Sequence, residues 1–127
     1  VLREKPIRID MTWFDPKHLE PKIAIEYETN EKSIMESEVR NLAASSAKLK
    51  VLVTYAKGGT QQDLLQEIKE RWKKRSKRIW DDELLVMLIV FHTEKGYRVF
   101  DNFEGYIIYA TRDSLKVKKM RNSIIYL

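Results

Sequence analysis

The sequence predicts an α/β domain built on a mixed β-sheet flanked by helices. Two segments near the N-terminus, residues 7–13 and 22–28, alternate between apolar and polar side chains, as strands with one buried face do. Two later segments, residues 33–46 and 61–78, repeat apolar side chains at helical spacing. Each is followed by a short, largely apolar run. This strand–helix–strand order favours parallel pairing within a mixed sheet that has helices on its faces.

Length and composition favour one globular unit. The chain has 127 residues, and we expect residues 1–127 to form a single domain. Hydrophobic residues make up 43% of the chain, which is enough for a core and argues against intrinsic disorder. The sequence starts with Val rather than Met, and the expectation is either a processed product or part of a longer protein.

The chain contains no cysteine, which excludes a disulfide scaffold, a cysteine-based zinc or iron–sulfur site and a cysteine nucleophile. We therefore expect an intracellular, cytoplasmic protein. The longest apolar run, residues 84–91, is far shorter than the roughly 20 residues of a membrane span. The charged start of the chain lacks the apolar segment of a signal peptide, so no membrane association is expected.

The first two strands, residues 7–13 and 22–28, are expected to pair as an antiparallel hairpin because only a short loop with two prolines joins them. Their apolar side chains are expected to face the core. That set includes Trp13 and Tyr27, and Tyr55 on a later strand is expected to join it. The helix at 33–46 follows.

Residues 49–55 carry apolar side chains on both faces, which is typical of an interior strand. Gly58-Gly59-Thr60 ends this strand and starts the second helix, whose expected inner stripe consists of Leu64, Leu65, Ile68, Trp72 and Ile79. A second buried strand is predicted at 83–91, then a turn at Lys95-Gly96 and two short strands at 97–100 and 106–109. The tail, residues 114–127, ends in apolar residues that we expect to dock on the domain.

Three acidic residues form the main candidate site. Glu26 and Glu28 are two residues apart on one strand and therefore share a face, and Asp10 lies on the polar face of the preceding strand. Clustered carboxylates repel one another unless a cation neutralises them, and Mg²⁺ prefers such oxygen ligands. A solvated strand face, with Arg8 or Lys22 paired to the acids, remains the alternative.

This arrangement resembles the PD-(D/E)xK, or restriction-endonuclease-like, nuclease superfamily. The resemblance lies in residues 8–13 (RIDMTW) and 23–28 (IAIEYE), followed by a helix and by the strand at 48–53 (KLKVLV). It covers residues 7–55, and the later helix and strand fit the rest of that family's αβββαβ core. Two departures stand out. Glu28 replaces the usual motif lysine, and the helix that normally precedes the first strand is missing.

The resemblance implies a metal-dependent endonuclease that hydrolyses phosphodiester bonds in nucleic acid, with DNA as the expected substrate. Asp10 and Glu26 would hold Mg²⁺ or Mn²⁺. Glu28 would act as a further ligand or as a base that orients water, and Lys22 or Lys50 would supply the missing positive charge. A non-catalytic nucleic-acid-binding or assembly module of the same fold is the alternative. A homodimer is a further expectation, because many nucleases of this fold cut both strands as dimers.

A basic run on the second helix is the candidate nucleic-acid contact. The chain carries 24 Lys and Arg against 19 Asp and Glu, giving a net charge of +5. Its densest basic segment consists of Lys69, Arg71, Lys73, Lys74, Arg75, Lys77 and Arg78. Such a run attracts phosphates. The alternative is an ordinary solvated helix face with Trp72 in the core. His18 and His92 are expected to be surface or packing residues rather than ligands.

Overall fold

The computed structural model describes residues 11–17, 21–28, 37–75 and 83–120. Six strands form one mixed sheet, and two helices are described beside it. In chain order the elements are β1 (Met11–Phe14), β2 (Pro21–Glu28), α2 (Val39–Ala44), β3 (Leu49–Lys57), α3 (Gln61–Arg75), β4 (Leu84–Glu94), β5 (Tyr97–Ala110) and β6 (Leu115–Lys119). The predicted α/β class with a mixed sheet is confirmed.

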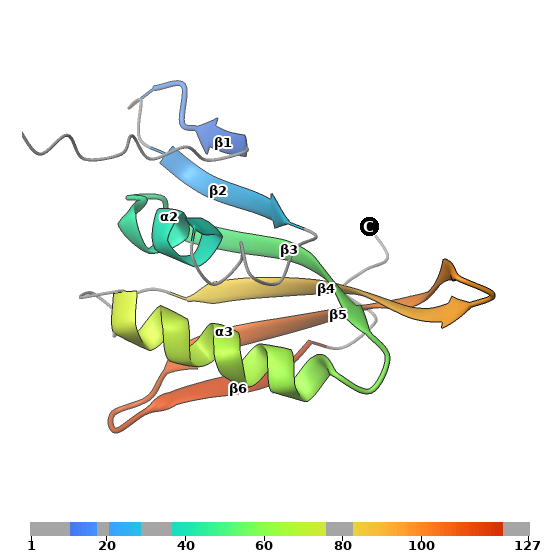
Figure 1. The fold of residues 1–127 in the computed structure, drawn as a ribbon. Coiled ribbons are helices and arrows are strands. Elements are labelled where there is room, and N and C mark those ends of the chain that lie inside the picture. Colours follow the sequence, from blue (N-terminus) through green and yellow to red (C-terminus); the bar gives the residue numbers. More distant parts are fainter. Residues whose placement is uncertain (1–10, 18–20, 29–36, 76–82, 121–127) are drawn as a thin grey trace, which may run out of the picture.

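The sheet order follows the chain order, β1 to β6 (Figure 1). β1 and β2 are antiparallel, which confirms the predicted hairpin. β2, β3 and β4 are mutually parallel, and β4, β5 and β6 are antiparallel. The parallel centre of the sheet therefore carries the two helical connections, and antiparallel strands lie at both edges.

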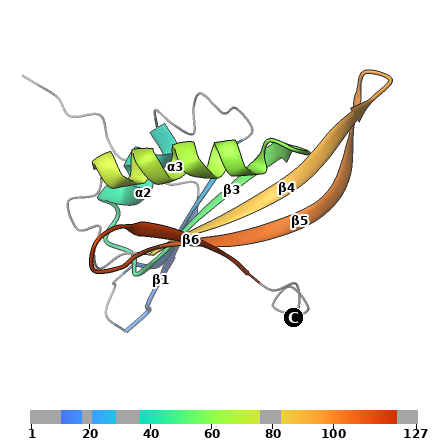
Figure 2. The same cartoon turned by 90° about the horizontal axis from the view of Figure 1, so that it is seen from below.

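Both described helices lie on the same face of the sheet (Figure 2). The connections from β2 to β3 and from β3 to β4 step across the sheet in the same direction. Because such crossovers are almost always right-handed, two steps in one direction put both helices on one side. The expectation of helices on both faces is thus wrong for the described part of the chain.

The helices partly match their predicted extents. α3 begins at Gln61 as predicted, and the remainder of the predicted helix beyond Arg75 lies outside the described residues, as does Ile79. α2 occupies the C-terminal part of the helix predicted at 33–46. Neither described helix is long and apolar enough to cross a membrane.

The core lies between the helices and the face of the sheet that they cover. Leu42 of α2 and Leu65, Ile68 and Trp72 of α3 are fully buried. Beneath them lie alternate residues of the strands, which are Ala24, Leu52, Ala56, Leu84, Val86, Leu88, Val90, Tyr106 and Ile108. The predicted inner stripe of the second helix is confirmed for its four described members.

The other face of the sheet is apolar and is not covered by any described element. Trp13 is 67% exposed and Tyr27 is 45% exposed, so the prediction that these aromatic side chains belong to the core is wrong. The face of β2 that the helices cover carries Ala24 and Glu26 instead. Alternation in the sequence separates two faces of a strand, but the side on which the connecting helices pass decides which face is buried.

β4 and β5 form a long hairpin whose tip extends beyond the end of α3 (Figure 2). β5 is one strand of 14 residues, so the prediction of two separate short strands in this region is wrong. Three polar residues at positions 101, 102 and 104 interrupt the apolar pattern of the sequence, although residues 102–104 continue the pairing with β4. A register shift between Val90 and Phe91 bends the hairpin.

The turn predicted at Lys95-Gly96 is confirmed between Glu94 and Tyr97. Both turn residues have positive φ, 49° for Lys95 and 82° for Gly96, as the tight two-residue hairpin turn requires. A residue with a side chain at position 96 would have to adopt this left-handed backbone conformation, which costs about 1–2 kcal/mol. We expect Gly96→Ala to lower the free energy of unfolding by about that amount in urea titrations. The control is Gly58→Ala, because an added Cβ there meets only ordinary contacts, the nearest at 3.5 Å, and we expect no comparable loss.

Candidate functional site

Glu26 and Glu28 lie on the helix-covered face of β2. Glu26 is 2% exposed and Glu28 is half-buried, and the two side chains alternate with the exposed Tyr27. The predicted shared face of the two acids is therefore confirmed, and it is the face of the sheet on which the helices lie. Asp10, the third acid of the predicted site, lies outside the described residues.

A buried lysine of the neighbouring strand shares this face. Lys50 of β3 is 1% exposed and stands in register with Ala24, whereas Glu26 stands in register with Leu52. With strands about 4.8 Å apart and a rise of about 3.3 Å per residue, the Glu26 and Lys50 positions are about 8 Å apart, which two long side chains can span. Charged side chains are rarely buried this deeply unless they are paired. This placement favours mutual compensation of the two charges.

The Lys50 ammonium also lies against an aromatic ring. Its Nζ is 5.5 Å from the centroid of the Trp72 ring in α3. An ammonium at this distance is attracted by the negative face of an indole. The full burial of Trp72 confirms the core alternative for this residue, and its ring also contacts the Lys50 ammonium.

Thr54 is a buried polar residue beside the acids. It is fully buried, stands in register with Glu28, and projects from the same face as Lys50. Its Oγ1 makes no hydrogen bond to any residue of the described part of the chain. A buried hydroxyl without a partner is unfavourable, and such groups often point to a ligand or a water molecule.

The donor set fits a hard divalent cation. Glu26, Glu28 and Thr54 offer carboxylate and hydroxyl oxygens on adjacent strands, and Mg²⁺ and Mn²⁺ are bound by oxygen ligands of this kind. Within residues 11–17, 21–28, 37–75 and 83–120, no three carboxylate, His or Cys groups are placed to share one ion. The metal site therefore stays a prediction, and so does the contribution of Asp10 to it.

The two lysines considered as replacements for the missing motif lysine differ in their surroundings. Lys22 is partly exposed and its Nζ lies 3.9 Å from Oδ2 of Asp15 in the loop after β1, so it makes an ion pair away from Glu26. Lys50 is buried on the face that carries Glu26. The structure therefore favours Lys50 as the source of positive charge at this site.

The described residues of the predicted basic run lie on more than one side of α3. Of its side chains, the structure describes Lys69, Arg71, Lys73 and Lys74, while Lys77 and Arg78 lie outside the described residues and Arg75 ends α3. Successive helical residues are turned by about 100°, so Lys69 and Lys73 share one side and Arg71 lies on the opposite flank. Phosphate binding by the run as a whole stays a prediction.

His92 is a surface residue, as predicted, and it lies between two acids. Its Nδ1 is 2.6 Å from Oδ1 of Asp101, and its Nε2 is 3.4 Å from Oε2 of Glu94. Asp101 is the extra residue of β5 at the register shift between Val90 and Phe91. Its carboxylate contacts the His92 imidazole.

The hydrogen bonds to Asp101 and then Glu94 raise the pKa of His92 above its ordinary value of 6.5. A pKa raised by folding means that protonation stabilises the folded hairpin; this stabilisation is complete below the unfolded pKa and is lost as pH rises through the folded pKa. In an NMR titration we expect the His92 ring to titrate above 6.5 and Asp101→Asn to lower that pKa. An unchanged pKa in Asp101→Asn contradicts the assignment of the shift to this acid.

Sequence reasoning missed Thr54 as part of the site and the contact between Lys50 and Trp72. Neither has a signal in the sequence, because both depend on the parallel register of β2 and β3 and on the packing of α3. No model of a known protein family and no curated protein matches this chain.

Proposed function

We propose that this chain is a metal-dependent nuclease of the restriction-endonuclease-like fold, hydrolysing phosphodiester bonds in nucleic acid, with DNA as the first substrate to test. The observation that carries the proposal is the joint burial of Glu26 and Lys50 on one face of adjacent parallel strands. A carboxylate and a lysine side by side are what the motif of that superfamily brings together. Here the lysine comes from the next strand instead of from position 28.

The arrangement of β1, β2, α2 and β3 supports the proposed fold. An antiparallel hairpin, a helix and a further strand match the last four elements of the superfamily's αβββαβ core, so one strand of that core has no counterpart among the described residues before α2. The second crossover, through α3, and the antiparallel strands β5 and β6 extend this unit. Glu26 and Glu28 then lie on β2, the second strand of the hairpin, as the resemblance implies.

In this proposal Asp10 and Glu26 hold Mg²⁺ or Mn²⁺. The bound ion would activate a water molecule and stabilise the charge that develops on the scissile phosphate. Lys50 offsets the charge of Glu26 and adds positive potential near the phosphate. Glu28 either completes the ligand set or accepts the proton of the attacking water, and the buried Thr54 hydroxyl beside it offers a hydrogen bond to that group.

The second candidate is a non-catalytic nucleic-acid-binding module of the same fold. The near-complete burial of Glu26 favours it, because a substrate phosphate must reach the metal ligands. The two candidates differ in their metal requirement. A nuclease needs Mg²⁺ or Mn²⁺ for activity, whereas a binding module binds nucleic acid equally well in a chelator.

The test uses supercoiled plasmid DNA, which only an endonuclease converts to nicked and linear forms. The full chain is incubated with Mg²⁺, Mn²⁺ or EDTA, and a single-stranded RNA is included as a second substrate. Cleavage with either metal and none in EDTA supports the proposal. No cleavage of any substrate, together with salt-sensitive DNA binding in EDTA, contradicts it and supports the binding module.

A further inference from the structure

The sheet face opposite to the helices, the open face, carries a row of aromatic side chains. Its members come from β2, β3, β4 and β5 and are Tyr27, Tyr55, Phe91, Phe100 and Phe103. The ring centroids of Tyr27 and Tyr55 are 5.9 Å apart, and those of Tyr55 and Phe100 are 5.5 Å apart. Phe100 is 57% exposed and Phe103 is 49% exposed. Exposed apolar surface gathered in this way marks an interaction site.

The open face is also positively charged. Arg98 stacks on the aromatic row, with its guanidinium carbon 4.7 Å from the centroid of the Phe91 ring. Lys57 stands in register with Phe91, and Lys118 of β6 stands in register with Ile107. The basic side chains of this face are Lys57, Arg98, Lys116 and Lys118. None of them makes an ion pair within the described part of the chain, so their charges are available to a partner.

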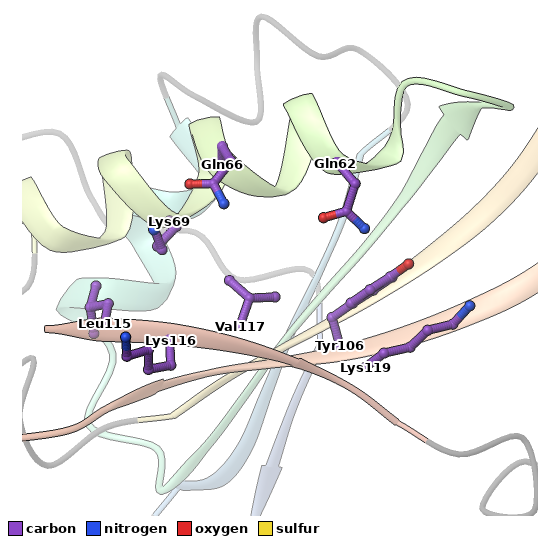
Figure 3. A pocket seen from close by; sticks show the side chains of 8 residues that line it. All are labelled: Gln62, Gln66, Lys69, Tyr106, Leu115, Lys116, Val117 and Lys119. Carbon is purple, nitrogen blue, oxygen red and sulfur yellow. The ribbon is translucent and has the colours of Figure 1, made fainter.

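The acidic residues of the described strands lie on the opposite side of the sheet. Those of β2 are on the helix face. Glu104 of β5 accepts a hydrogen bond from Tyr106, which lines a pocket of about 390 Å³ between α3 and β6 on the helix side (Figure 3). The acids of the β4–β5 hairpin both contact His92, whose position alternates with Phe91 along β4. The open face therefore attracts anions.

A second copy of the chain fits this surface poorly. In a symmetric dimer formed through the open face, the same patch of both copies would meet. Arg98 and the lysines of one copy would then approach the cations of the other, and like charges across an interface oppose association. The open face instead requires a partner that carries negative charge together with flat apolar groups.

Single-stranded nucleic acid has both of these properties. Its phosphates are anionic, and its unpaired bases expose flat faces that stack on aromatic side chains. In a duplex, neighbouring base pairs cover these faces. We propose that the open face binds single-stranded nucleic acid, with bases stacked on Phe100 and Phe103 and phosphates at Arg98 and Lys118. From Arg98 to Ile107, the partner of Lys118, β5 spans about 30 Å, which is enough for several nucleotides.

This inference deepens the proposed function and rests on it in taking nucleic acid as the partner. It concerns a different surface, because the open face and the face that carries Glu26 are the two sides of one sheet. Binding to the open face needs no metal and is therefore measured in EDTA, where a nuclease is inactive. Failure of cleavage and failure of this binding are thus separate results.

The test is fluorescence anisotropy of the full chain in EDTA with a labelled single strand of about 12 nucleotides, as DNA and as RNA, and with the DNA duplex of the same sequence. We expect a single strand to bind at least about tenfold more tightly than the duplex, because stacking needs unpaired bases. The tighter of the two single strands identifies DNA or RNA as the ligand. Duplex binding as tight as that of the single strands, or no binding of either single strand, overturns the proposal.

Two variants test the stacking. Phe100→Leu and Phe103→Leu remove a ring but keep an apolar side chain, so each is expected to weaken single-strand binding by about fivefold to a hundredfold. The matched control is Tyr97→Leu, since Tyr97 is an exposed aromatic residue of the same strand that pairs with Glu94 and projects from the other face. We expect no more than about a twofold change there. Equal loss in the control and in the open-face variants, or no loss in any of them, overturns the assigned contacts.

The phosphate contacts are tested by Arg98→Gln and Lys118→Gln. Each variant is expected to lower the slope of log K against log salt concentration by about 0.7, the value for one phosphate of a single strand. Slopes that equal that of the original chain overturn these contacts.

Two other partners have readouts of their own. A dimer that is seen in sedimentation velocity and that Phe103→Leu dissociates identifies the open face as a contact between copies of the chain. Co-sedimentation with phosphatidylserine vesicles, without binding of any single strand, identifies an anionic membrane surface as the partner. Either result overturns the proposal.

Discussion

Replacing Glu26 by glutamine is expected to reduce metal-dependent DNA cleavage by about a hundredfold to a thousandfold. Glutamine keeps the size of the side chain and removes the negative charge that would hold the cation. A bound metal contributes several kcal/mol to the stabilisation of developing charge, and each 1.4 kcal/mol corresponds to tenfold in rate. The measurement is the rate of plasmid nicking at saturating Mg²⁺ or Mn²⁺.

The control for this change is Glu67→Gln, which removes one negative charge from the exposed surface of α3. Its cleavage rate is expected to stay within about twofold of that of the original chain. Circular dichroism at the assay temperature shows that both variants are folded. A folded Glu26→Gln variant that cuts DNA at the original rate contradicts the assignment of Glu26 as a metal ligand.

Glu28→Gln separates the two roles proposed for Glu28. If Glu28 is a metal ligand, this variant needs a higher metal concentration for half-maximal cleavage and recovers its rate at saturating metal. If Glu28 is the base, the rate stays low at any metal concentration and the pH profile of cleavage changes. A variant with an unchanged rate, metal requirement and pH profile contradicts both roles.

The fold was predictable where local patterns decide it. Helical periodicity identified the four buried residues of α3, and Lys95-Gly96 identified the hairpin turn, because both depend on residues close in sequence. The prediction of which face of β1 and β2 is buried was wrong, because that face depends on where the connecting helices pass and not on the local pattern. The helices cover the face with Ala24 and Glu26, and Trp13 and Tyr27 stay exposed within the described structure.

The candidate site shows the same limit. The sequence placed Glu26 and Glu28 on one face because a strand has a period of two residues. It offered Lys22 and Lys50 as equal sources of positive charge. Only the parallel register of β2 and β3 brings Lys50 close to Glu26, and only the packing of α3 places Trp72 over it. Register between distant strands is a tertiary property, so no local pattern contains it.

Lys50→Met is expected to lower the free energy of unfolding by about 3–5 kcal/mol, a large share of the 5–15 kcal/mol typical of a domain. Methionine keeps most of the side-chain volume and can still pack against Trp72. The loss arises because the charge of Glu26 then stays buried without its compensating ammonium. Urea denaturation followed by tryptophan fluorescence measures the change. The control, Lys57→Met, replaces an exposed lysine at the end of β3 and is expected to change stability by no more than about 0.5 kcal/mol.

The double variant Glu26→Gln with Lys50→Met distinguishes a charge pair from two independent effects. Each single change leaves one buried charge uncompensated, whereas the double change removes both charges. If the two side chains compensate each other, the double variant is more stable than the sum of the single losses predicts, by about 2 kcal/mol or more. Strict additivity would show that each charge is stabilised by other groups, and it would contradict the pairing of Glu26 with Lys50 that the proposed nuclease site assumes.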